Sequence, residues 1–113
     1  ALVQEFGSRM PTQLLTQLAD RAQAVSQSGL SLIDQLVESV QTVLEDWEAD
    51  DLQVMARPLA LSMRGGQEEI LDVVLQSVRQ TDWQDLSELE QARLSLAIAR
   101  YALRELAQAE GEE

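Results

Sequence analysis

The sequence contains no cysteine, histidine, lysine or asparagine in its 113 residues. Without cysteine and histidine it can form no disulfide and no tetrahedral zinc site of the usual kind. Without a thiol, an imidazole or a lysine amine, it also lacks the side chains most often used as nucleophiles, general bases and Schiff-base formers. We therefore expect a protein that has no catalytic residues, is not an enzyme, and needs no metal and no cofactor.

Positive charge is also scarce. Acidic residues outnumber basic residues 20 to 8, every basic residue is an arginine, and the formal net charge is −12. A protein that binds DNA or RNA without regard to sequence needs positive charge to neutralise phosphates, so we expect no direct binding of nucleic acid. The apolar fraction of 45% is ordinary for a globular protein and too high for a chain kept unfolded by its charge.

Long apolar runs are absent as well. No stretch approaches the ~18 consecutive apolar residues of a membrane span, and no signal-peptide pattern is present. We therefore expect a cytoplasmic protein that does not contact a membrane.

The first nine residues differ in character from the rest. Glu5-Phe6 and Gly7-Ser8 are the dipeptides that two common restriction sites encode when read in frame. We interpret residues 1–9 as a leader derived from cloning; the alternative is a genuine apolar anchor. The remaining organisation that we expect is a native start at Met10, one helical domain over residues 10–113, and a frayed acidic tail over residues 109–113.

Apolar residues at steps of three and four predict α-helices over most of the chain. The first predicted helix covers about residues 12–28, where Pro11 suits a first turn and Gly29 suits a C-terminal cap. The second covers about residues 31–48, because apolar residues continue without a miss from Leu30 to Trp47. Ser31, with Asp34 three residues later, resembles a capping box at its start.

The middle of the chain is harder to assign. A short helix can begin near Leu52, but Pro58 is expected to break or kink it around Arg57. Residues 59–63 alternate between apolar and small residues, which also fits a short strand. Since a lone strand would have no partner, we favour a kinked helix. Gly65-Gly66 then marks a break.

Two further helices complete the pattern. One is predicted over about residues 67–80. The other runs to about Gln108 and begins with Ser87 and Glu90, which form an S-x-x-E capping box. Between these helices, Trp83 and Leu86 are expected to plug the core from a short turn. The fold class is therefore all-α: a small bundle of four to five helices with a kinked or irregular middle around Pro58.

The last predicted helix has two apolar faces, although a surface helix needs only one. One explanation is that it lies at the centre of its own bundle. The other is that its second face meets another chain, most simply a twin protomer. That candidate protein interface consists of Leu94, Ile98 and Tyr101, with a basic stripe of Arg93, Arg100 and Arg104 beside them.

A dense run of acids lies between Glu45 and Asp51, with five acids in seven residues and no base. It lacks the alternating ligands and central glycine of a calcium-binding loop. It fits either a docking patch for a basic partner or a solvated helix end whose acids cap the next segment. The candidate acidic docking patch is Glu45, Asp46, Glu48, Asp50 and Asp51.

These features predict a non-enzymatic protein–protein interaction module that acts as an adaptor, an assembly factor or a regulatory subunit. Its expected partners are a second copy of itself, in a homodimer, and another protein. Two alternatives remain open. One is an acidic mimic of nucleic acid that inhibits a DNA- or RNA-binding protein, and the other is a helical bundle that binds an apolar small molecule.

Overall fold

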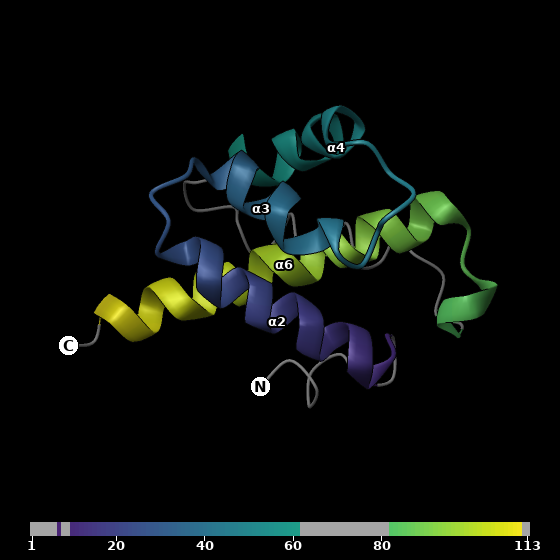
Figure 1. Ribbon diagram of the computed structural model, residues 1–113, viewed down its shortest axis with the longest axis horizontal. Helices are drawn as coiled ribbons and strands as arrows, with labels where there is room; N and C mark the ends of the chain where they lie inside the picture. The colour runs from purple at the N-terminus through teal and green to yellow at the C-terminus, as the bar shows by residue number, and fades with distance from the viewer. Residues whose placement is uncertain (1–6, 8–9, 62–81, 112–113) are drawn as a thin grey trace.

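The computed structural model describes Gly7, residues 10–61 and residues 82–111. The described residues form α-helices and one short 3₁₀ turn, with no β-strand among them (Figure 1). The predicted all-α bundle is therefore confirmed, whereas the helix predicted over residues 67–80 and the Gly65-Gly66 break lie outside the described residues. The helices are α2 (Thr12–Ser26), α3 (Leu32–Gln41), α4 (Ala49–Leu61) and α6 (Glu88–Gly111), and the 3₁₀ turn is η1 (Trp83–Asp85).

Helix α2 follows the predicted pattern closely. Its buried side chains are Leu15, Leu18, Ala22 and Val25, which lie at steps of three and four along one face. The chain then turns at Gly29, whose φ of +80° is in the left-handed region. Glycine adopts this conformation without a steric penalty, so the position is suited to the turn between α2 and α3.

Replacing Gly29 by alanine is expected to lower the free energy of unfolding by about 1 kcal/mol. A Cβ at this position would meet no atom within 4 Å, so the cost comes from backbone conformation and not from a clash. Urea unfolding followed by circular dichroism measures the change. Exposed Ala24, replaced by glycine inside α2, is a control for the general effect of backbone entropy. A Gly29→Ala variant as stable as the parent protein would contradict the assignment of strain to this turn.

Helix α3 begins as predicted but ends earlier. The Ser31 hydroxyl accepts a hydrogen bond from the Asp34 backbone N–H at 3.3 Å, which caps the helix. The predicted continuation to Glu48 is wrong, because the helix ends at Gln41 and turns follow. Electrostatics disfavours an end near Glu48. A longer helix would have placed Glu45, Asp46 and Glu48 near its negative C-terminal end.

Helix α4 settles the described part of the ambiguous middle, up to Leu61, in favour of a helix. It begins at Ala49, earlier than predicted, and continues through Pro58 to Leu61 without a break at Arg57. The carbonyl of Val54 would normally accept a bond from residue 58, which as proline has no N–H. Val54 is 61% exposed, so water can replace the missing donor. The kink itself stays a prediction.

Helix α6 is the central element, packing against α2, α3 and α4 (Figure 1). It begins with the predicted capping box: the Ser87 Oγ accepts from the Glu90 N–H at 3.1 Å, and the Glu90 carboxylate accepts from the Ser87 N–H at 3.2 Å. Before it, η1 brings Leu86 into the core and packs Trp83 against it, as predicted. None of the described helices is both long enough and apolar enough to cross a bilayer.

Candidate functional site

The five acids of residues 45–51, called the acidic segment below, all lie on the surface. Glu45, Asp46 and Glu48 belong to the connection between α3 and α4, whereas Asp50 and Asp51 occupy the first turn of α4. The first turn of a helix is its positive end, so these two carboxylates also stabilise α4. The acidic segment is thus both a helix start and an exposed concentration of negative charge.

Trp47 explains how these acids are held outward. Its side chain is half-buried and packs against the hydrophobic core, as predicted from its place in the apolar spacing. Its backbone N–H also donates to the Leu44 carbonyl at 3.1 Å, which closes a turn. Buried Leu44 and half-buried Trp47 therefore anchor the connection, and the acids on either side of Trp47 remain in solvent.

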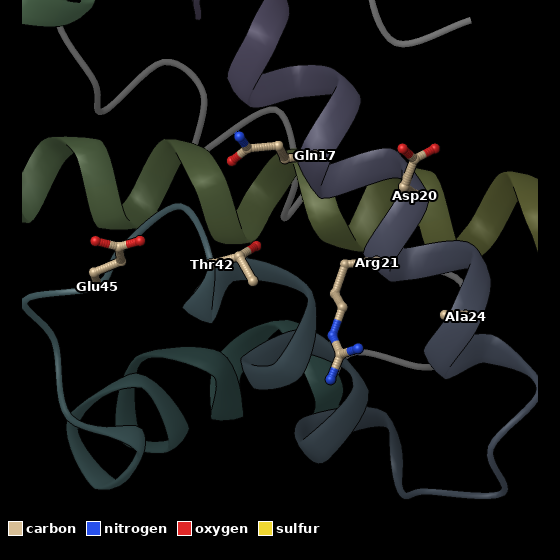
Figure 2. Close-up of a pocket in the computed structure, with 6 residues that line it drawn as sticks. All are labelled: Gln17, Asp20, Arg21, Ala24, Thr42 and Glu45. Atoms are coloured by element: carbon tan, nitrogen blue, oxygen red, sulfur yellow. The ribbon is translucent and has the colours of Figure 1, made fainter.

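A surface hollow of about 540 Å³ lies beside the acidic segment, between α2 and the end of α3. Figure 2 shows one side chain, Arg21, reaching from α2 toward α3, with Thr42 and Glu45 on the opposite wall. We call this feature the α2–α3 hollow. It is open to solvent and lined by Gln17, Asp20, Arg21, Ala24, Thr42 and Glu45.

Charge in the α2–α3 hollow is unbalanced toward the negative. The Arg21 guanidinium is 2.9 Å from the Glu38 carboxylate, and the two form an ion pair that joins α2 to α3. Both side chains are well exposed, so the pair contributes at most about 1 kcal/mol to stability. Its main consequence is electrostatic: the cation at the hollow has a partner, while Asp20 and Glu45 add two further negative charges to the lining.

The described residues contain no group of three or more acids arranged to hold a metal ion. The acidic segment is spread along a loop and a helix turn and does not converge on one point. Its chemistry is that of an extended anionic surface.

Two of the three apolar residues of the predicted protein interface are not on the surface. Leu94 and Ile98 are 0% exposed in the single chain, so both belong to the core of the bundle. The second apolar face of α6 is explained by its central position: every residue from Leu94 to Arg100 is buried. The interpretation of Leu94 and Ile98 as a surface for a twin protomer is therefore wrong, whereas the homodimer itself stays a prediction.

The predicted basic stripe is also divided by the fold. Arg93 is exposed and Arg100 is 7% exposed, whereas Tyr101 and Arg104 are half-buried. The Arg104 guanidinium carbon lies 6.0 Å from the centre of the Tyr101 ring, at the outer limit of a cation–π contact. These arginines therefore present no continuous basic surface with which the acids of another copy could pair.

Arg100 has a structural role instead. Its Nε donates a hydrogen bond to the Leu59 carbonyl at 3.4 Å, which ties α6 to the C-terminal turn of α4. A cation is favourable there because the end of a helix carries partial negative charge. Desolvation by burial, together with the nearby charge of Arg104, lowers the pKa of Arg100.

The α2–α3 hollow was not predicted from the sequence. Gln17, Asp20 and Arg21 lie outside the apolar stripe of α2, which identifies them as surface residues but not as neighbours of Glu45. The proximity of α2 to the end of α3 depends on tertiary packing. The early end of α3, which places Thr42 and Glu45 in a turn, was not predicted either.

Comparison with known proteins adds no family. No protein-family model matches the chain, and no curated protein and no solved structure matches it significantly.

Proposed function

We propose that this protein is a non-enzymatic interaction module that binds a basic partner protein through its acidic segment. The observation that carries the proposal is the exposure of all five carboxylates between Glu45 and Asp51, with no base among them. The surrounding charge supports it, because a chain with a net charge of −12 attracts basic partners over a distance of about one Debye length.

The acidic segment suits recognition because its backbone is anchored while its side chains are free. Leu44 and Trp47 fix the connection to the core, and α4 fixes the position of Asp50 and Asp51. A surface already held in place loses less conformational entropy on binding than a disordered acidic tail does. The anchored backbone therefore favours a defined docking surface over charge that serves only solubility.

Neutralising three acids of the segment is expected to weaken binding of a basic peptide about tenfold, since each exposed ion pair contributes roughly 0.2–1 kcal/mol. The variant is Asp46→Asn, Glu48→Gln and Asp51→Asn. The probe is fluorescein-labelled nonaarginine, and fluorescence anisotropy at about 0.15 M salt gives the dissociation constant.

A matched control separates the docking surface from the net charge. Asp82→Asn, Glu88→Gln and Glu105→Gln also remove three exposed acids, and Glu88, like Asp51, lies in the first turn of a helix. We expect the control to weaken binding of nonaarginine less than threefold. Equal losses in the two triple variants would show that nonaarginine responds only to total charge and would overturn the proposal.

The nucleic-acid mimic predicted as an alternative would use the same carboxylates and differs only in its partner. Affinity capture with the parent protein and both triple variants as baits, followed by elution with duplex DNA, distinguishes the two functions. A partner released by duplex DNA, but not by polyglutamate at the same concentration of negative charge, is a nucleic-acid-binding protein, because charge alone would make the two competitors equivalent. Apolar-ligand binding has less support, because the α2–α3 hollow is open to solvent and five of its six lining residues carry a polar or charged group.

A further inference from the structure

We infer that the α2–α3 hollow receives an arginine side chain from an extended segment of the basic partner. This inference rests on the proposed function and specifies the residue type that the partner inserts. It starts from position: Glu45 belongs both to the acidic segment and to the lining of the hollow. A chain lying along the acidic segment therefore reaches the hollow without a gap.

Size and shape agree with one side chain and the backbone beside it. The volume of about 540 Å³ lies within the range of pockets that hold small ligands, which is roughly 300–1,000 Å³. The hollow is open along the surface, so an occupant can enter sideways as part of a longer chain. An enclosed cavity would instead favour a free small molecule.

The charge of the lining residues favours a positively charged side chain in the hollow. Glu45 attracts a cation from one wall of the hollow, and Asp20 adds negative charge at its rim, with the carboxylate turned away from Thr42 and Glu45 (Figure 2). The Arg21 guanidinium opposes the cation weakly because Glu38 is only 2.9 Å away. Guanidinium is favoured over ammonium because its five N–H donors fit carboxylates and neutral acceptors at once. The neutral acceptors present are the Gln17 amide and the Thr42 hydroxyl.

The surface on the other side of the hollow fits the backbone of such a segment. The exposed side chains of α2 are mainly glutamine and threonine, and Asp20 and Arg21 are the only charged residues of this helix. Glutamine amides both donate and accept, so they can pair with the N–H and C=O groups of an extended peptide. The acidic segment and the largely uncharged α2 surface thus lie on opposite sides of the hollow.

The test uses N-acetyl-argininamide as the probe in a ¹⁵N–¹H correlation titration of the full chain. We expect chemical-shift changes to centre on the amides of Gln17, Ala24, Thr42 and Glu45. N-acetyl-citrullinamide, which has nearly the same shape but no charge, is expected to cause no comparable shifts. Shifts centred on residues 46–51 with the hollow unmoved, or no saturable shift, would overturn the inference.

Two substitutions probe the site independently. Ala24→Leu fills the hollow without changing charge and is expected to weaken binding of the probe at least tenfold, whereas Gln23→Leu, on the same helix but outside the lining, leaves it unchanged. Glu45→Gln is expected to weaken binding two- to fivefold. Wild-type affinity of the Ala24→Leu variant would overturn the inference. The triple variant at residues 46, 48 and 51 leaves the hollow intact, so this result is distinguishable from failure of the proposed function.

Discussion

An aspartate in place of Ile98 is expected to unfold the protein and not to dissociate a dimer. Ile98 is 0% exposed at the middle of α6, the helix that contacts α2, α3 and α4. The substitution removes a buried apolar side chain and places a carboxylate where it has no solvent. Such a change costs more than about 4 kcal/mol, a large part of the roughly 5–15 kcal/mol that stabilises a domain.

Far-UV circular dichroism and size-exclusion chromatography with light scattering measure this outcome together. The control is Leu89→Asp on the same helix, because Leu89 is 44% exposed and a new acid in the first turn of α6 favours the helix dipole. We expect the control to stay helical and to change stability by less than about 1 kcal/mol. A helical Ile98→Asp protein of half the parental mass would instead restore the predicted dimer interface.

The predictions that held rest on local signals. The capping box of Ser87 and Glu90 and the cap at Ser31 depend on residues three positions apart, so the sequence contains all the information they need. The apolar spacing of α2 likewise predicted its buried face. In each case the stabilising partners lie within the element itself or on one regular face of it.

The end of α3 shows where apolar spacing loses its meaning. Leu44 and Trp47 continue the steps of three and four, yet they lie in turns after Gln41. The spacing of apolar residues indicates which side chains are buried. It does not identify the secondary structure, because a side chain in a turn can be buried as well as one in a helix. The acids between these two residues were the contrary signal, because negative charge disfavours the end of a helix.

The candidate site divides in the same way. The exposure of the acidic segment follows from its composition and could be predicted from the sequence. The α2–α3 hollow and the burial of Arg100 could not be predicted from the sequence, because each depends on contacts between residues of different helices. For α6, two apolar faces meant either a central helix or an interface, and only the packing of the other helices around it separates these cases.

Arg100 is the second position at which we expect a large effect. Replacement by alanine is expected to lower the free energy of unfolding by about 2–3 kcal/mol. Its side chain is 7% exposed and its hydrogen bond to the Leu59 carbonyl links α6 to α4, so truncation leaves a cavity and removes the link. Thermal and urea unfolding measure the loss. Exposed Arg93, replaced by alanine on the same helix, is the control and is expected to change stability by less than about 0.5 kcal/mol.

Replacement of Arg100 by methionine separates packing from charge. Burial and the neighbouring Arg104 lower the pKa of Arg100, so the folded state holds this proton less readily than the unfolded chain does. By linkage, the cost of burying this charge beside Arg104 exceeds its attraction to the negative end of α4, so the charge opposes folding at every pH below the folded-state pKa. Methionine restores most of the volume without the charge, and we expect it to recover at least half of the stability lost in the alanine variant. If methionine is as destabilising as alanine, then the hydrogen bond to Leu59, and not the packing of the side chain, is what α4 requires from Arg100.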